Sequence, residues 1–256
     1  MPISLWFGDG RIAEGRKWTG QGCDVFARRD SDPPLIRRAF CPNANTLAMW
    51  ENNAGIGEIR SEHYYDPVKL ALATGIQPPI PFMVSRLLNE LKNVTGTDPL
   101  ADIQPAHGFH FTFLPLTQPR YKVNEPLPEN MEQLRQLWRE FHGRKIVIRR
   151  LRLVALPSQL LLAGIPDEPA IALRQSFCEK LLKTPWRQEL LLRHNHSPLP
   201  APFWHSTLLR YRAAFLPAAV RQFFIERQDC GFGEVAGEMA LARINYNWTK
   251  YYPVEM

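Results

Sequence analysis

Cysteine is scarce in this chain, and the four cysteines form no local pattern. They stand at positions 23, 41, 178 and 230, far apart and without a Cys-x-x-Cys pair. That spacing argues against a zinc ribbon and against a disulfide scaffold. Free thiols in a reducing compartment are the simplest account, so a cytoplasmic protein is expected.

Long apolar runs, repeats and biased segments are also missing. No stretch approaches 18 uninterrupted apolar residues, so no membrane span is predicted. The first nine residues have no basic segment and no long apolar core, and they do not predict a signal peptide. The chain has no internal repeat and no low-complexity tract.

Several catalytic signatures are absent. The sequence contains no G-x-S-x-G, no H-E-x-x-H and no cysteine with a partnered local motif, which argues against serine hydrolases and zincins. Gly10–Arg16 approaches a phosphate-binding loop but lacks the final Ser or Thr and a preceding apolar strand, so it is rejected. His194-Asn195-His196 resembles a metal pair, yet no Asp or Glu stands near it, and a surface loop is expected.

The chain does have enough apolar residues for a substantial core. It also carries a slight excess of positive charge. Of its 256 residues, 45% are hydrophobic, which allows one large core or two modest lobes. The formal charge of +6 mildly favours polyanions such as nucleotides or RNA, as it does in many soluble enzymes. The basic cluster Lys145/Arg149/Arg150/Arg152 could line a phosphate path, although solvated strand edges are the simpler interpretation.

Hydrophobic periodicity predicts an α+β or α/β chain. Residues 1–41 are rich in Gly, Pro and charge and predict a loop-rich lead-in, while 42–256 predict one compact domain. Helices are expected at 81–91, 130–141, 169–182 and 217–228, with Asp167 or Glu168 capping the third and with Phe82, Leu87, Leu88 and Leu91 on one face of the first. Strands are expected at 46–50, 109–116, 145–156, 159–164 and 203–211, with one strand or a strand pair at 234–248.

One pattern occurs twice on apolar strands: histidine, any residue, threonine, then a hydrophobic residue. The two copies, which stand 95 residues apart, are His110-Phe111-Thr112-Phe113 and His205-Ser206-Thr207-Leu208. Because residues i and i+2 of a strand share a face, each histidine points the same way as its threonine. The repetition suggests two related lobes, each giving one strand to a shared cleft.

These residue types suit hydrolysis of a phosphodiester. The reaction needs a base for the attacking oxygen and an acid for the leaving oxygen, and two histidines can fill both roles near neutral pH. The hydroxyls of Thr112 and Thr207 can donate to the phosphate oxygens as charge builds on them. Such a design requires no metal, and no cofactor is expected.

The paired segments resemble the H-x-[ST]-hydrophobic motifs of the 2H phosphoesterase superfamily. This superfamily includes bacterial RNA 2′,3′-cyclic phosphodiesterases, also called 2′-5′ RNA ligases, and eukaryotic cyclic nucleotide phosphodiesterases. The resemblance implies a bilobal α+β fold over about residues 42–248, in which two antiparallel sheets form a central cleft with helices outside. It also implies that His110 and His205 are the catalytic pair and that Thr112 and Thr207 bind phosphate.

Further substrate contacts are predicted close to the motifs. They are Trp204, Arg210 and Tyr211 around the second motif and His107 at the rim of the first. Arg210 has odd parity relative to Thr207, which leaves open that it faces away from the site. The aromatic residues of 246–252 could stack on bases, although a packed C-terminal tail is the favoured interpretation.

The sequence therefore predicts a metal-independent phosphodiesterase. Its substrate would be a 2′,3′-cyclic phosphate, a 2′-5′ linkage, or a small cyclic or oligonucleotide, and a monomer is expected. The first alternative is a non-catalytic nucleotide- or RNA-binding protein that keeps the cleft. The least favoured alternative is a metal-dependent hydrolase that uses His194 and His196.

Overall fold

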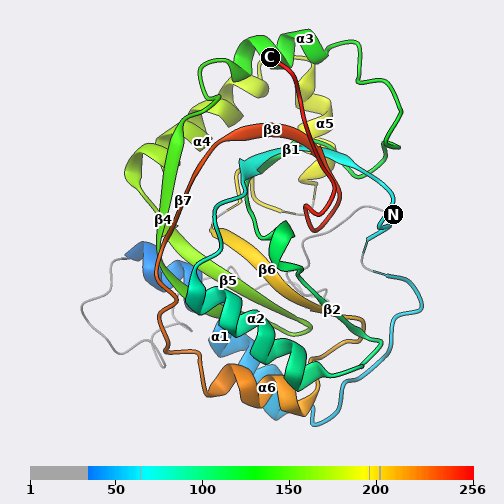
Figure 1. Ribbon diagram of the computed structural model, residues 1–256, viewed down its shortest axis with the longest axis vertical. Coiled ribbons are helices and arrows are strands. Elements are labelled where there is room, and N and C mark those ends of the chain that lie inside the picture. Colours follow the sequence, from blue (N-terminus) through cyan, green and yellow to red (C-terminus); the bar gives the residue numbers. More distant parts are fainter. Residues whose placement is uncertain (1–33, 64, 196, 202) are drawn as a thin grey trace, which may run out of the picture.

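The protein is an α+β structure with two antiparallel sheets, as expected (Figure 1). The computed structural model describes residues 34–63, 65–195, 197–201 and 203–256, and side chains from residue 43 onward. Most of the predicted lead-in, with Gly10–Arg16, therefore lies outside the described residues. Within the described part, no helix has the length and apolarity needed to cross a membrane.

The two sheets contain four and five strands. The smaller sheet has the order β3-β1-β8-β9, with β1 at Ala71–Ile76, β3 at Phe111–Pro115, β8 at Ala240–Ile244 and β9 at Tyr251–Pro253. The larger sheet has the order β2-β6-β5-β4-β7, with β2 at Ala101–Ile103, β4 at Lys145–Leu156, β5 at Gln159–Pro166, β6 at Trp204–Tyr211 and β7 at Val235–Glu238. Each sheet thus contributes one of the two motif strands, β3 or β6.

Helices lie at both ends of the molecule (Figure 1). The group at the lower end in that view is α1 at Pro34–Glu51, α2 at Phe82–Thr95 and α6 at Ala218–Ile225. The group at the upper end is α3 at Met131–Trp138, α4 at Glu168–Leu181 and α5 at Trp186–Arg193. A 3-10 turn, η1 at Ala106–Gly108, precedes β3. The expected cap of α4 is confirmed, since the Asp167 carboxylate accepts a hydrogen bond from the Ala170 amide.

A cluster of aromatic rings joins the two sheets beneath the motif strands. Phe113 of β3 packs edge-on against Trp204 of β6, with 5.4 Å between ring centroids. Trp138 of α3 and Phe177 of α4 continue the cluster at 5.0 Å from each other. Burial of such large rings contributes much of a core's stability. The hydrophobic position of the first motif therefore anchors its strand in this core.

The segment 46–50, predicted to be a strand, is the last part of helix α1. Thr46 and Trp50 are buried, and they recur at the i, i+4 spacing of a helix. Their side chains donate to Ala155 O and Pro157 O, which fixes the helix against the end of β4. Because α1 begins at Pro34, the boundary expected at residue 41 falls inside this helix.

Two other expectations need correction. In α2 the buried face consists of Val84, Leu87, Leu88 and Leu91, whereas Phe82 is 78% exposed because it opens the helix and lies two residues before that stripe. Residues 234–248 do form two strands, but β7 pairs with β4 and β8 pairs with β1, so they belong to different sheets. The short strands β1, β2 and β9 and helix α5 were not predicted.

Candidate active site

The two motifs open into one pocket between the sheets. Its volume is about 120 Å³, and its lining includes His110, Thr112, His205, Thr207 and Arg210. His110 immediately precedes β3 and Thr112 lies on it, while the other three residues lie on β6. The structure therefore brings together residues that the sequence separates by 95 positions.

A β-bulge follows the threonine of each motif. In β6, Thr207 pairs with Leu161 and Leu209 with Leu160, which leaves Leu208 as the extra residue. Phe113 is the extra residue of β3 in the same way, between the pairs Gly75–Thr112 and Thr74–Leu114. A bulge resets the alternation of a strand. Arg210 consequently lines the pocket with His205 and Thr207, although strict alternation would have turned it away.

His110 is held in one tautomer by the turn that precedes it. Its Nδ1 lies 2.7 Å from the carbonyl oxygen of Gly108. Because a carbonyl only accepts, Nδ1 carries the hydrogen and Nε2 keeps a free lone pair. The imidazole also stacks on Trp248, with centroids 4.9 Å apart and planes at 12°. Burial lowers the pKa of His110 to about 3, and the nearby Arg210 and His205 act in the same direction.

His205 is half-buried and less constrained. Burial lowers its pKa to about 4, with the charges of Arg210 and Arg174 adding to the effect. Phe203 packs beside its ring at a centroid distance of 5.0 Å, and within the described residues neither ring nitrogen has a hydrogen-bond partner. Burial therefore favours the neutral form of both imidazoles at pH 7.

Arg210 is the most deeply buried cation on the pocket wall, with 4% of its surface exposed. Its Nη1 lies 3.8 Å from Asp102 Oδ2, and its Nη2 donates to the carbonyl oxygen of Tyr246 at 3.4 Å. The guanidinium also lies over the rings of Tyr65 and Tyr246, 5.2 and 4.9 Å from their centroids. A guanidinium fixed from several sides is suited to holding an anion in one position.

Two more arginines reach the pocket from helices that the motifs do not include. Arg174 of α4 donates to Ala201 O at 2.8 Å and stacks over Trp204 at 4.3 Å. Burial lowers its pKa to about 10, which leaves it charged at neutral pH. Arg193 ends α5 and also lines the pocket. Three cations around a small, half-enclosed space favour an anionic ligand.

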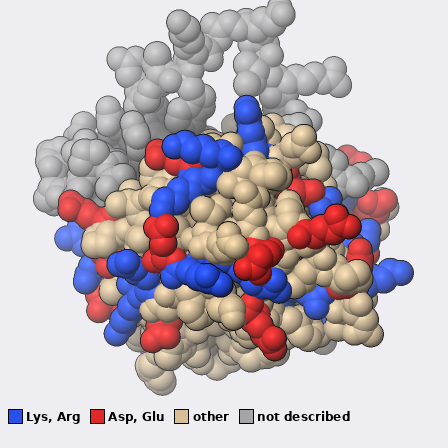
Figure 2. Space-filling view, turned by 90° about the horizontal axis from the view of Figure 1, so that it is seen from above, with Lys and Arg blue, Asp and Glu red and all other residues tan. Residues whose placement is uncertain are grey.

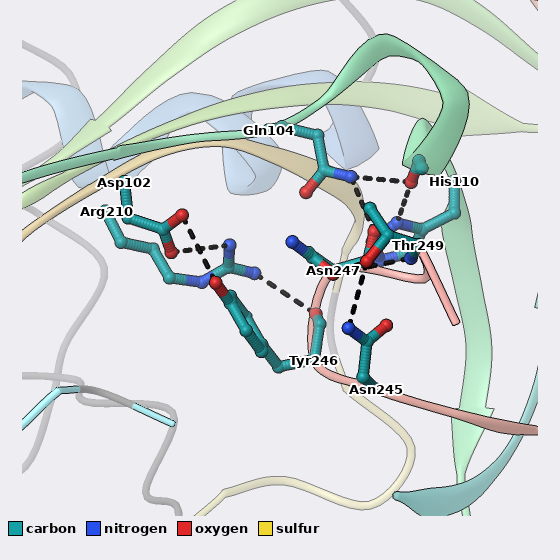
Figure 3. Close-up of polar contacts among 9 residues, drawn as sticks. Asp102, Gln104, His110, Arg210, Asn245, Tyr246, Asn247 and Thr249 are labelled. Atoms are coloured by element: carbon teal, nitrogen blue, oxygen red, sulfur yellow. Dashed lines mark hydrogen bonds and ion pairs between the residues drawn. The ribbon is translucent and has the colours of Figure 1, made fainter. Parts of the chain in front are cut away.

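Gln104 links the turn before His110 to the C-terminal turn (Figure 3). Its backbone amide donates to the carbonyl oxygen of Leu208, the bulged residue of β6, at 2.9 Å. Its side-chain Nε2 donates to Gly108 O at 2.6 Å and to Asn247 O at 2.7 Å. The same Gly108 carbonyl orients His110, so Gln104 positions the imidazole indirectly, by fixing that carbonyl. No side chain fits at position 108, because a Cβ there would lie 2.3 Å from Asn247 O.

Replacing Gln104 by leucine tests this arrangement. Leucine keeps much of the volume but removes the amide donor. Asn247 O then loses its partner, at about 1–3 kcal/mol, whereas Gly108 O keeps only its bond with His110 Nδ1. We expect a lower denaturation midpoint, and we expect kcat to fall more than KM rises because the imidazole loses its orientation. Gln136→Leu on the exposed face of α3 is the matched control. An unchanged kcat in a folded Gln104→Leu protein would contradict a positioning role.

Three predicted substrate contacts do not line the pocket. His107 is exposed on η1, one turn before the strand. Trp204 alternates with His205 and therefore points into the aromatic core, where it is 1% exposed. Tyr211 follows Arg210 and faces the other side of β6, where its hydroxyl donates to Asp98 Oδ2 at 2.8 Å. None of the three is retained as a substrate contact.

Other pocket residues were missed or interpreted differently. Trp248 is buried, as a packed tail would require, but its ring is stacked on the catalytic candidate His110. Tyr246 lines the pocket in parallel with Tyr65, at 5.2 Å and 6°. The C-terminal aromatic cluster was thus a usable signal. No sequence signal pointed to Arg174 and Arg193, because isolated basic residues on helices are common on solvated surfaces.

His194, which was expected in a surface loop, is buried at the end of α5 and lines the pocket. Its Nε2 lies 3.0 Å from Pro115 O and its Nδ1 lies 3.3 Å from Ser197 Oγ. Burial lowers its pKa to about 4. His196 lies outside the described residues. In the described ranges, no group of three or more His, Cys, Asp or Glu side chains is placed to hold a metal ion.

The basic cluster on β4 lies away from the pocket lining. Arg149 is exposed and forms an ion pair with Glu234 at 3.5 Å. Lys145 and Arg150 are exposed on the same strand. Figure 2 shows a surface on which acidic and basic side chains alternate, without one broad basic patch. In the pocket, by contrast, Arg174 and Arg210 are buried and Arg193 also lines the wall, so an anionic ligand there would meet three positive charges.

The fold and the pocket together define an α+β protein with two sheets and a pair of histidines between them. No protein-family model and no curated protein matches the sequence. Among solved structures, TT0787 of Thermus thermophilus is similar at 19% identity, covering 72% of this chain and 95% of that one, with a TM-score of 0.46. A phosphoesterase is similar at 16% identity, with 73% and 96% covered and a TM-score of 0.46. LigT of E. coli in apo form is similar at 15% identity, with 73% and 95% covered and a TM-score of 0.45.

Proposed function

We propose that the protein is a metal-independent phosphodiesterase of the 2H phosphoesterase type, acting on a nucleotide or RNA phosphodiester. One observation carries this proposal: both His-x-Thr motifs line a single pocket together with a buried arginine. Histidines supply the proton transfers, and threonine hydroxyls and a guanidinium supply donors for the phosphate oxygens.

His110 is proposed as the general base and His205 as the general acid. The Gly108 carbonyl holds the hydrogen of His110 on Nδ1, so its Nε2 is free to accept a proton. The oxygen of a water, or of a neighbouring ribose hydroxyl, attacks phosphorus and passes its proton to His110. The bond from phosphorus to the leaving oxygen breaks, and His205 gives that oxygen a proton.

A bound substrate is expected to set the protonation states that this reaction needs. The charge of Arg210 lowers the pKa of both histidines. A phosphodiester carries one negative charge, which favours the imidazolium form beside it. The pKa of His205 therefore rises on binding, and kcat remains high to a higher pH than kcat/KM, since kcat/KM reports the free enzyme.

A turnover panel tests the proposed function. The purified protein is incubated with the nucleoside 2′,3′-cyclic phosphates and with 2′-5′- and 3′-5′-linked dinucleotides, with and without EDTA. At least one of them should be converted, at a rate that the chelator leaves unchanged. Tight binding of these compounds without any conversion would instead favour a nucleotide-binding protein that keeps the pocket.

A further inference from the structure

A second pocket adjoins the catalytic pocket. Its volume is about 280 Å³, and its lining includes His63 and Tyr65, the residues just before and within β2, and the end of β6. Three residues, Tyr65, Arg210 and Tyr246, line both pockets. The two spaces are therefore neighbours separated by one buried guanidinium and a stacked pair of tyrosine rings.

The shared arginine has donor capacity left on this boundary. Nη1 of Arg210 is buried and donates no hydrogen bond to any described residue, its nearest acidic partner being Asp102 at 3.8 Å. The side chain as a whole is 4% exposed, so it has little conformational freedom. A phosphate placed against this guanidinium would lie at the junction of the two pockets.

The second pocket also presents groups suited to an organic ligand. Arg212 lines it and brings a second guanidinium to its wall. Asp102 lines it as an acceptor, already receiving the Tyr246 hydroxyl at 3.2 Å. The tyrosine rings form an aromatic wall, and aromatic side chains stack readily on bases. Aromatic surface beside a donor and an acceptor fits a nucleoside better than a bare anion.

The volumes of the two pockets also favour an organic ligand over a bare anion. Pockets for small organic ligands usually enclose at least about 300 Å³. The catalytic pocket alone is well below that size, whereas the two pockets together exceed it. A ligand larger than a phosphate group must therefore extend beyond the catalytic pocket, and the second pocket is adjacent to it.

We infer that the second pocket binds the second organic arm of a two-armed phosphodiester, with a nucleoside as that arm; this rests on the proposed function. The two ester oxygens of a linear diester carry different groups, which leave phosphorus in different directions. With the phosphate at Arg210, one arm lies in the catalytic pocket and the other in the second pocket. In a 2′,3′-cyclic phosphate both ester oxygens belong to one ribose, and the second pocket is unused.

The test compares substrates with one and two arms. Values of kcat/KM are measured for adenosine 2′,3′-cyclic phosphate and for the 2′-5′ and 3′-5′ adenosine dinucleotides. Wild type is expected to prefer a dinucleotide. Arg212→Ala is expected to lower kcat/KM for that dinucleotide at least about tenfold more than for the cyclic phosphate, because it removes a charged donor to the second arm. Arg187→Ala on the exposed face of α5 is the matched control.

The possible outcomes distinguish failure of the second-pocket assignment from failure of the proposed phosphodiesterase function. An equal effect of Arg212→Ala on both kinds of substrate overturns the two-armed assignment and leaves the phosphodiesterase proposal intact. Turnover of the cyclic phosphate alone by wild type has the same meaning. No turnover of any of the three compounds contradicts the proposed function itself. If Arg212→Ala does not fold by circular dichroism, His63→Ala, an exposed residue of the same pocket, replaces it with the same expected selectivity.

Discussion

Replacing His110 or His205 by alanine is expected to lower turnover of a phosphodiester about 10²- to 10⁴-fold in each case. Each substitution removes one of the two proton transfers of the proposed mechanism, and neither removes a residue of the main aromatic core. Because the two groups are proposed to act on the same step, the turnover rate of the double variant should be only slightly below that of the less active single variant. The measurement is the rate on the best substrate of the panel, in the presence of EDTA.

His142→Ala serves as the control for these variants. His142 is exposed beyond α3 and does not line the pocket. It should retain wild-type activity, and all three proteins should keep the far-UV circular dichroism spectrum of the parent. Full activity in a folded His110→Ala or His205→Ala protein would remove that residue from the mechanism.

Arg210→Gln is expected to reduce kcat/KM about 10²- to 10³-fold, the range seen when a single preorganised donor to a developing anion is removed. Glutamine retains polarity but carries no charge, so Asp102 loses its ion-pair partner and keeps only the hydrogen bond from Tyr246. Arg210→Lys should recover only part of the loss, since an ammonium cannot occupy the position of a planar guanidinium between an acid, a carbonyl and two rings.

The same substitution should move the pH dependence in a defined direction. The pKa values of His110 and His205 are about 3 and 4, and the charge of Arg210 lowers both. The proposed mechanism needs one proton on this pair, and pKa values this low place that proton there only at acidic pH. On the proposed mechanism, kcat/KM of wild type should therefore decrease from acidic toward neutral pH. Removing the positive charge raises both pKa values, and the decrease in Arg210→Gln should occur at higher pH. If the pH dependence of kcat/KM is the same in Arg210→Gln as in wild type, Arg210 is not electrostatically coupled to the histidines.

Local sequence patterns determined the elements with strong periodicity. The long alternating run of β4 and the helix with Met131, Leu134 and Trp138 on one face were found with nearly correct bounds. Thr46 and Trp50 were assigned to a strand because a five-residue apolar window fits both periods. β1 was missed because all six of its residues are buried, which removes the alternation that identifies a strand.

The residues of the candidate site likewise divide into those that a local sequence pattern predicts and those that it does not. His110, Thr112, His205 and Thr207 could be predicted because strand parity acts within a few residues. Trp204 and Tyr211 were misplaced because neighbours in sequence were taken as neighbours in the site, whereas alternation turns both away from it. Arg174, from a helix, has no local relation to either motif.

The sequence by itself therefore determined the candidate pair His110 and His205, because each histidine and its threonine are two positions apart on one strand. The tertiary structure alone decided what surrounds that pair. A bulge at Leu208 turns Arg210 toward the pocket, Gln104 fixes the turn that orients His110, and the C-terminal turn brings Trp248 against its ring. Each of these depends on pairing and packing between segments far apart in the chain, for which a local pattern carries no information.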